Sequence, residues 1–299
     1  MDQRVFVVFN PHSGKGRGAT LIEPVLAALR EGGGVEHAST LRAGDEPRLV
    51  REALSRGFRT LVAVGGDGTW SNVANVLLAE GAGGDVRLGL VPAGTGCDLA
   101  KSLAIPARDV AACARIARAG VPRRIDVGRI EERCFLNVAG FGFDIAVIER
   151  SWSVRWLGGD LLYLYCALLE LYAFPGFAVE VEADGLSLGR LDQMMLVFPN
   201  ARIFGGGFRI APHADLADGR IEMVGFGNMG LFARLGMMGR LRAGSHLSAP
   251  QVISRAAARY RLRFERPPAY ETDGEWNQAK SAELSVETLP GALTVMAGE

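Results

Sequence analysis

The sequence has few cysteines, no surplus of charge and no long hydrophobic run, and each shortage excludes a class of protein. Its 299 residues include four cysteines (Cys97, Cys113, Cys134 and Cys166), without a CxxC pair and without a histidine at metal-ligand spacing. We therefore expect reduced thiols in a cytoplasmic protein. Lysine plus arginine number 33, as do aspartate plus glutamate, so the chain lacks the basic surplus that nucleic-acid binding requires.

The hydrophobic runs are too short for a signal peptide or a membrane span. The N-terminal run, Val5–Phe9, has five residues before Asn-Pro, which is shorter than a signal-peptide core. The longest internal run, DLLYLYCALLELYAF at 160–174, contains Glu170 and falls short of the roughly 20 residues that cross a bilayer. Its leucine and tyrosine stripe at helical spacing favours a core helix.

What the chain does have is enough apolar sequence for two cores, since 48% of its residues are hydrophobic. Up to about residue 126, short β-branched runs alternate with helical periodicity, which predicts an α/β domain with a parallel sheet and a ligand site at the strand ends. Beyond that point, many short strands predict a mainly antiparallel β-sandwich, with helices at 142–174 and 229–243. We expect two domains, residues 1–125 and 126–299.

Three glycine-rich loops follow predicted strands of the first domain: NPHSGKGRG at 10–18, GGDGTWSN at 65–72 and PAGTGCDLA at 92–100. Glycine lets backbone N–H groups approach an anion, and the helix after each loop directs its positive end there. The loops therefore predict a phosphate site at one edge of the sheet. We expect Asp67, which lies between glycines, on an exposed turn where its carboxylate can hold Mg²⁺ or a ribose hydroxyl.

Two common phosphate motifs fit the first loop less well. A Walker A loop would need glycine in place of Phe9 and serine or threonine in place of Gly16. The GxGxxA run of Gly14, Gly16 and Ala19 mimics a dinucleotide fingerprint. It stays a weaker alternative, because NPHS separates the strand from the first glycine and because it gives no role to GGDGT.

The three loops, in this order and spacing, resemble those of the diacylglycerol and sphingosine kinase superfamily, whose motifs read N-P-x-S-G-K-G, G-G-D-G-T and P-x-G-T-x-N-D. In the second domain, FPNARIFGGGFRIAPHADLADGRIEMV at 198–224 is similar to the family's N-x-x-x-x-G-G-G-x-x-x-x-P-x-A-x-x-x-D-G segment, and ETDGEW at 271–276 resembles its D-G-E segment. The resemblance covers nearly the whole chain. It implies ATP-dependent phosphorylation of a diacylglycerol-, phosphatidylglycerol- or sphingoid-like lipid in the cleft between the domains.

The resemblance also implies roles for individual residues. The nucleotide site would comprise Asn10, Thr40, Gly65, Gly66, Asp67, Gly68, Thr69, Trp70, Ser71, Asn72, Gly94 and Thr95. Asp273 and Glu275 would stand at the reacting hydroxyl, and one of them would be the general base. Asp-Gly at 273–274 predicts a tight turn that lets only one of the two face the substrate, and which one is open. A second-domain Mg²⁺ would be held by the Asp218 carboxylate and by the carbonyls of Asp215 and Arg220, in a loop that by itself would be a solvated turn.

Departures from the family pattern leave two alternatives open. Ser71 and Asn72 stand where the family has asparagine and glutamate, and Cys97 stands where it has asparagine. These changes remove an amide and a carboxylate from the expected nucleotide edge, so a non-catalytic nucleotide- or lipid-binding homologue is one alternative. The shared G-G-D-G makes a NAD kinase-like enzyme the other.

The lipid side is expected on apolar helices of the second domain. The segment MGLFARLGMMGRLRAGSHL at 229–247 predicts an amphipathic helix with Arg234, Arg240 and Arg242 beside leucine and methionine. Such helices lie on anionic membrane surfaces. We therefore expect peripheral, transient contact with a membrane and no nucleic-acid partner, and a homodimer is left open.

Overall fold

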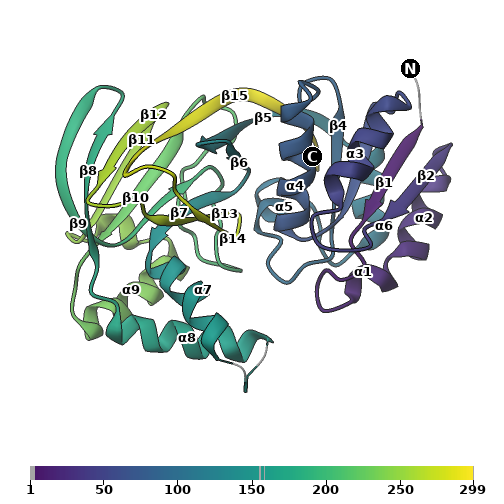
Figure 1. Ribbon diagram of the computed structural model, residues 1–299. Coiled ribbons are helices and arrows are strands. Elements are labelled where there is room, and N and C mark those ends of the chain that lie inside the picture. Colours follow the sequence, from purple (N-terminus) through teal and green to yellow (C-terminus); the bar gives the residue numbers. More distant parts are fainter. Residues whose placement is uncertain (1–3, 155, 158, 299) are drawn as a thin grey trace.

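A computed structural model describes residues 4–154, 156–157 and 159–298, and it has the two expected parts, an α/β domain and a β-sandwich (Figure 1). The four strands of the first domain are parallel, in the order β2 (Val35–Ser39), β1 (Val5–Phe9), β3 (Thr60–Gly65) and β4 (Arg87–Pro92). All five residues of β1 are buried. A continuous apolar run of this kind is typical of a parallel sheet covered on both faces.

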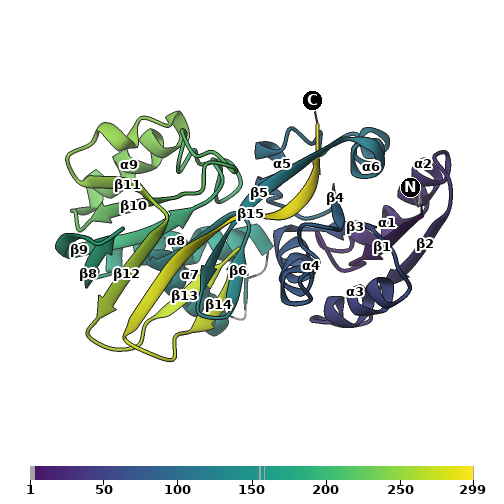
Figure 2. The ribbon, with the colours of Figure 1, turned by 90° about the horizontal axis from the view of Figure 1, so that it is seen from above.

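Helices cover both faces of this sheet. Their bounds are α1 (Arg17–Thr20), α2 (Ile22–Arg30), α3 (Glu46–Ser55), α4 (Asp67–Ala79), α5 (Asp98–Ser102) and α6 (Val110–Ala119). Helices α2 and α6 pack together on one face, and α3 and α4 pack together on the other (Figure 2). The predicted parallel α/β domain is confirmed.

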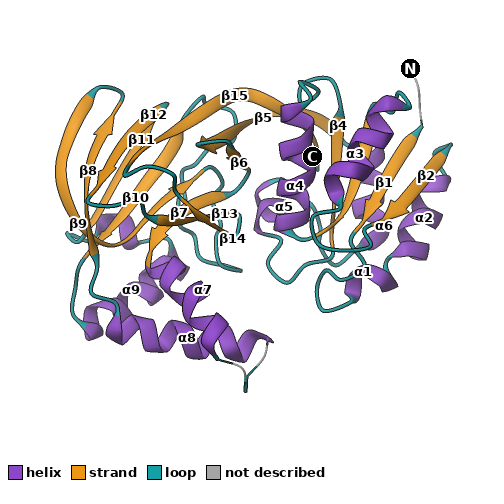
Figure 3. Ribbon diagram, in the orientation of Figure 1, coloured by secondary structure: helices purple, strands orange, loops and turns teal. Residues whose placement is uncertain are grey.

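The second domain is mainly antiparallel. Its strands are β5 (Val121–Ile130), β6 (Arg133–Phe135), β7 (Val138–Gly142), β8 (Phe177–Ala183), β9 (Leu186–Pro199), β10 (Ile221–Gly227), β11 (Val252–Ala257), β12 (Arg259–Phe264), β13 (Ala269–Thr272), β14 (Glu275–Gln278) and β15 (Glu283–Ala297). Helices α7 (Phe143–Ser153), α8 (Gly159–Ala173) and α9 (Leu231–Ala243) lie together on one side of the sandwich (Figure 3), and a short 3₁₀ turn, η1 (His246–Ser248), follows α9. The predicted sandwich and helical segments are confirmed.

Two long strands connect the domains. β15 pairs antiparallel with β5 along most of its length, and its end pairs parallel with β4 through Thr294 and Val295. Residues 126–299 therefore do not form one separate body, because the end of β15 completes the sheet of the first domain. The pairing covers an edge of β4 that would otherwise expose unpaired backbone groups.

The prediction that α8 is a core helix is wrong. Its exposed apolar side chains are Leu161, Tyr163, Leu164, Tyr165, Leu168, Leu169 and Tyr172, whereas Cys166 and Leu171 are buried. The helix is apolar on most sides, and the fold supplies a packing partner for only part of its surface. The neighbouring α9 adds exposed Leu231, Phe232, Leu235 and Met238. Among the described helices, none combines the length and apolar character that a bilayer span requires.

Candidate active site

The strand ends of the first domain and one hairpin of the second enclose a cavity of about 350 Å³. The glycine loops contribute Asn10, Ser13, Gly14, Gly66, Asp67, Gly68, Thr69, Asn72, Gly94, Thr95 and Gly96, the segment after β2 contributes Ala43, Gly44 and Glu46, and the β13–β14 hairpin contributes Asp273 and Glu275. All three glycine loops therefore meet at one edge, as the strand order predicts.

The glycine loops contact one another through their backbones. A Cβ on Gly94 would stand 2.7 Å from Gly66 Cα, and a Cβ on Gly14 would stand 2.0 Å from the Ala93 oxygen. Because no side chain fits into such contacts, glycine is required for this edge to close. The close packing brings the backbones of the glycine loops to the cavity wall.

Asp67 begins helix α4 and is partly buried, so the expectation of an exposed turn is wrong. The loop after β4 folds over it, and its carboxylate accepts long hydrogen bonds from the backbone N–H groups of Asp98 (3.4 Å) and Leu99 (3.5 Å). Burial raises the pKa of Asp67 to about 6, and the charges of Asp98 and Asp273 add to the rise. The carboxylate therefore stands in a site that favours a cation.

Four of the expected nucleotide residues do not line the cavity: Thr40, Gly65, Trp70 and Ser71. The Trp70 indole is fully buried and donates to the Ala63 oxygen at 3.1 Å, so its side chain belongs to the core. Thr69 does line the cavity, and its Oγ1 accepts a 2.9 Å hydrogen bond from the Asn10 amide. This bond joins the first two glycine loops.

The hairpin between β13 and β14 makes the predicted tight turn. Asp273 has φ 50° and Gly274 has φ 87°, and Thr272 pairs with Glu275 across the turn. Positive φ at both central residues is the signature of a two-residue hairpin loop. The turn directs the two acidic side chains to different surroundings.

Asp273 is buried and fully engaged. Its Oδ2 accepts the Leu136 N–H at 2.8 Å, and its Oδ1 accepts the N–H groups of Asn137 (2.9 Å) and Val138 (3.1 Å). Burial raises the pKa of Asp273, whereas these bonds and a side-chain bond with Ser71 act in the opposite direction. The carboxylate thus fastens the hairpin to the segment before β7.

Glu275 is exposed, and its carboxylate accepts no hydrogen bond from the part of the chain that the structure describes. Its Oε1 lies 3.0 Å from the point where a Cβ on Gly68 would stand, so it faces the first turn of α4. The two acidic residues therefore differ: Asp273 is anchored, and Glu275 is free above the glycine loops.

The three residues that depart from the family pattern, Ser71, Asn72 and Cys97, differ in whether they are buried or line the cavity. Ser71 is fully buried beneath Asp273. The side chain at position 71 does not reach the cavity wall, so the expectation that Ser71 removes an amide from that wall is wrong. Asn72 does line the cavity. Cys97 is buried with φ 48°, a left-handed conformation in which asparagine is favoured over most residues. Burial raises the pKa of the Cys97 thiol to about 12.

One residue that lines the cavity, Glu46, was missed by sequence reasoning, and the sequence did not show which contacts Asp98 would make. Glu46 lines the cavity from the start of α3, is buried, and leaves Oε2 without a partner among the described residues. The Glu-Pro pair at a helix start after β2 was the available signal. Asp98 accepts bonds from the Lys101 ammonium (2.6 Å) and from the Gly206 N–H (2.8 Å), a contact between domains that no local pattern indicates.

The expected second-domain metal loop is an exposed turn with internal hydrogen bonds. Asp215 Oδ1 accepts the Ala217 N–H at 3.1 Å, and Asp218 Oδ1 accepts the Arg220 N–H at 3.0 Å. The described residues include no group of three His, Cys, Asp or Glu side chains that could hold a metal ion. A cation here would depend on backbone carbonyls and water, so this site stays a prediction.

An apolar cavity of about 140 Å³ lies between α7, α8, α9 and the sheet. The loop that contains Phe204 and Phe208 lines this cavity and also carries Gly206, whose N–H donates to Asp98 at the start of α5. Arg234 borders the cavity but is buried, with its guanidinium bonded to the carbonyls of Met229, Leu171 and Phe174. The expectation of a surface cation at Arg234 is therefore wrong, because it caps the end of α8.

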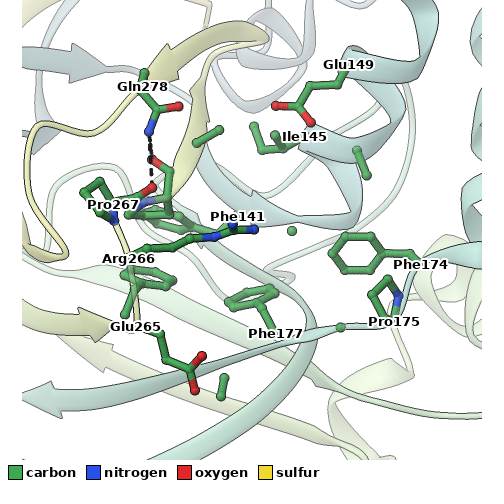
Figure 4. A pocket seen from close by; sticks show the side chains of 17 residues that line it. Phe141, Ile145, Glu149, Phe174, Pro175, Phe177, Glu265, Arg266, Pro267 and Gln278 are labelled. Carbon is green, nitrogen blue, oxygen red and sulfur yellow. Dashed lines mark hydrogen bonds between the residues drawn. The ribbon is translucent and has the colours of Figure 1, made fainter.

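A larger cavity, of about 790 Å³, is lined by residues of α7, the start of β8 and the β12–β13 connection (Figure 4). Phe141 and Phe177 form apolar walls, and Arg266 extends across it. None of the predicted site residues line this cavity. It is therefore distinct from the site that the glycine loops form.

An α/β domain whose glycine-loop edge faces a carboxylate-bearing hairpin of a β-sandwich is the arrangement expected of a two-domain kinase. Residues 4–130 match the diacylglycerol kinase catalytic domain, and residues 137–297 match the YegS C-terminal NAD kinase beta sandwich-like domain. The chain is 30% identical to a diacylglycerol kinase of Mycobacterium tuberculosis, over 98% of this chain and 94% of that protein.

Solved structures share the fold. A diacylglycerol kinase from Bacillus anthracis matches with a TM-score of 0.79 at 22% identity, covering 99% of this chain and 97% of that one. An NAD kinase from Archaeoglobus fulgidus in complex with ATP matches with a TM-score of 0.54 at 12% identity, covering 99% and 94%. The chain belongs to the diacylglycerol kinase family and is a lipid kinase, so the predicted resemblance is confirmed.

Proposed function

We propose that this protein transfers the γ-phosphoryl group of ATP to a hydroxyl of a membrane lipid of diacylglycerol, phosphatidylglycerol or sphingoid type. The observation that supports this most directly is the free Glu275 carboxylate, which stands above Gly68 at the edge where the glycine loops meet. A carboxylate from one domain thus faces a phosphate-binding edge of the other. Phosphoryl transfer needs this kind of positioning more than it needs a covalent nucleophile.

The nucleotide phosphates would bind the backbone N–H groups of the three loops, with the start of α4 contributing its positive end. Asn10 and Thr69 hold two of these loops together, and Asn72 and Thr95 complete the polar wall. The remaining expected residues, Thr40, Gly65, Trp70 and Ser71, would act from behind by shaping the loops.

Asp67 is the residue that would hold Mg²⁺ at the nucleotide. Its hydrogen bonds are long, and its pKa is raised by burial and then by the negative charges of Asp98 and Asp273, which a divalent cation would offset. A single carboxylate fits Mg²⁺, which commonly completes its shell with phosphate oxygens and water. When bound, the cation would neutralise charge on the transferring phosphate.

Glu275 is the proposed general base, and Asp273 is a positioning residue. Glu275 is free to accept the proton of the lipid hydroxyl as the new bond to phosphorus forms. Asp273 has its lone pairs engaged by three backbone N–H groups and holds the hairpin in place.

The lipid is proposed to approach over the exposed apolar face of α8 and α9, next to the apolar cavity between these helices and the sheet. Arg240 and Arg242 are exposed on the same helix as Phe232, which is 88% exposed. Such a surface suits peripheral contact with an anionic membrane. Phe232→Ser should weaken sedimentation with phosphatidylglycerol-containing vesicles, whereas Leu186→Ser, an exposed leucine on β9, should not. Equal binding of both variants would contradict the assigned face.

The activity is tested by incubating the purified protein with radiolabelled ATP and a total bacterial lipid extract, and then with each pure lipid class and with NAD. Labelled lipid is expected, and labelled NADP with unlabelled lipid would instead support the NAD kinase alternative. ATP binding without any labelled product would support a non-catalytic homologue. Glu275→Gln should lose transfer, and Glu283→Gln, an exposed glutamate on β15, is the matched control.

A further inference from the structure

Two buried carboxyl groups lie against each other behind the catalytic hairpin. Asp144 is in the first turn of α7 and Glu271 is on β13, and they are 4% and 1% exposed. Both approach Gly140 on β7, which pairs with Glu271. The point where a Cβ on Gly140 would stand lies 1.9 Å from Asp144 Oδ2 and 3.1 Å from Glu271 Oε1, so these two oxygens are at most 5.0 Å apart.

Each carboxyl group has one bonded and one unbonded oxygen. Asp144 Oδ1 accepts the Ile145 N–H at 2.9 Å, and Glu271 Oε2 accepts the Gly274 N–H at 2.6 Å. The facing oxygens, Asp144 Oδ2 and Glu271 Oε1, are buried and have no partner among the described residues. Buried oxygens without a hydrogen bond are uncommon and call for a physical explanation.

Among the described residues, none places a compensating cation against the pair. Burial and the charges of both carboxyl groups raise the pKa of Tyr163 of α8, and Asp273 adds negative charge from the hairpin. Arg234 of α9 borders the same cavity as Asp144, but its guanidinium is bonded to backbone carbonyls and to Asn228. Burial raises the pKa of Asp144 to about 7, and burial together with the charge of Asp144 raises the pKa of Glu271 well above its ordinary value.

We propose that Glu271 and Asp144 share one proton, with Glu271 Oε1–H donating to Asp144 Oδ2, and that this hydrogen bond holds the hairpin in position for the transfer described above. One proton satisfies both orphaned oxygens. With none, two like charges would face each other in a buried site; with two, one O–H would lack an acceptor. The role in transfer rests on the proposed function, whereas the shared proton does not.

The bond connects the lipid side to the catalytic side. Asp144 lines the apolar cavity, and Glu271 reaches the hairpin through the Gly274 N–H, next to Asp273 and Glu275. Loss of the proton at alkaline pH places two like charges between α7 and β13. The position of the hairpin, and with it turnover, should then fail as the pH rises.

The first test is the pH dependence of unfolding by denaturant between pH 5 and 9, without nucleotide or lipid. The folded chain keeps a proton that the unfolded carboxyl groups, with ordinary pKa values near 4, have lost. The unfolding constant of the parent should therefore rise by up to tenfold per pH unit for each retained proton, until the pH passes the folded pKa. Glu271→Gln should lose the part of this pH dependence that comes from the shared proton. The glutamine amide can donate to Asp144 Oδ2 and accept from the Gly274 N–H without a titrating proton.

Asp144→Asn provides a second variant should Glu271→Gln fail to fold, and it should lose the same contribution. If the unfolding constant of either folded variant depends on pH as steeply as that of the parent, the shared proton is overturned. A cation bridging the two carboxylates would make the unfolding constant fall as the pH rises and make it respond to chelator, which would also overturn it.

The second test is the pH profile of lipid phosphorylation. The parent should lose turnover on the alkaline side, Glu271→Gln should keep turnover there, and Glu271→Ala should be impaired at every pH because it loses the Gly274 contact. Glu222→Gln is the matched control, since Glu222 is a partly buried glutamate of β10 whose pKa burial also raises, and its profile should follow the parent.

If Glu271→Gln and Glu271→Ala lose turnover equally, the positioning role of Glu271 is overturned. Failure of the proposed function has a different signature, because the parent would then phosphorylate no lipid while the unfolding experiment would still report on the pair.

Discussion

The Gly206 N–H donates a 2.8 Å hydrogen bond to Asp98 Oδ2, which ties the glycine loop of the second domain to α5 of the first. Lys101 strengthens this junction, since its ammonium binds both Asp98 Oδ1 (2.6 Å) and the Gly206 oxygen (2.9 Å). The same loop lines the apolar cavity, so the proposed nucleotide edge and the proposed lipid side share one structural element.

Asp98→Ala should lower the free energy of unfolding by about 1.5–3 kcal/mol, because it removes hydrogen bonds to a buried charged group. Turnover should fall with it, since the two domains lose a contact next to the cavity. Denaturant unfolding and the lipid assay measure both effects. Asp85→Ala, an exposed aspartate of the same domain, should stay within about 0.5 kcal/mol of the parent. Equal free energies of unfolding for Asp98→Ala and Asp85→Ala would contradict a stabilising role for the contact between Asp98 and Gly206.

Glu275→Gln and Asp273→Asn should fail in different ways. Glu275→Gln should reduce kcat by about 10² to 10⁴ while ATP affinity and unfolding stay as in the parent, because it removes a proton acceptor that supports no contact in the described part of the fold. Asp273→Asn should lower the free energy of unfolding by roughly 1–3 kcal/mol, since its amide would face backbone N–H donors. Should Asp273→Asn instead lose only turnover while Glu275→Gln stays active, the two roles would have to be exchanged.

Asp67→Asn should leave the Tm at least as high as that of the parent. The ionised carboxylate is disfavoured by its partly buried, negatively charged surroundings, so neutralising it costs the fold nothing. Turnover with Mg²⁺ and ATP should fall by orders of magnitude, as measured by steady-state kinetics. Asp85→Asn is the matched control for loss of one acidic charge. Near-parent activity of Asp67→Asn would exclude Asp67 as the Mg²⁺ residue.

Cys97→Asn should be neutral or stabilising by up to about 1 kcal/mol, because asparagine tolerates the left-handed backbone that Cys97 adopts at φ 48°. Cys97→Val should be destabilising, since a β-branched residue is strained at positive φ. Denaturant unfolding measures the free energy of unfolding of both variants, which differ in how well the residue at position 97 tolerates positive φ. Greater stability of the valine variant would argue against backbone strain at this position.

The predicted second-domain Mg²⁺ is tested by thermal unfolding with and without chelator. Bound Mg²⁺ should raise the Tm by mass action, and Asp218→Asn should remove the increase. Asp215→Asn is the control, because only the carbonyl of Asp215 is a predicted ligand. If chelator leaves the parent's Tm unchanged, the segment is a turn held by its own hydrogen bonds.

Local sequence determined the features that depend on neighbouring residues. The alternation of β-branched runs and helical periodicity predicts the parallel sheet, and the glycines at 65, 66 and 68 predict a close backbone turn between β3 and α4. The Asp-Gly pair at 273–274 predicts a two-residue hairpin, because positive φ is a property of the residues at the turn themselves. These interactions lie within a few residues along the chain, so a single sequence contains them.

Only the tertiary structure decided what each side chain does. Asp273 and Glu275 are chemically similar and two residues apart, but the N–H groups that engage Asp273 come from residues 136–138. The Ser71 side chain meets Asp273 beneath the hairpin, and α8 exposes its apolar face because no other layer in the described part of the chain covers it. Contacts between residues so distant in sequence depend on how sheets and helices pack, and hydrophobic periodicity specifies that a face is apolar without specifying which surface will cover it.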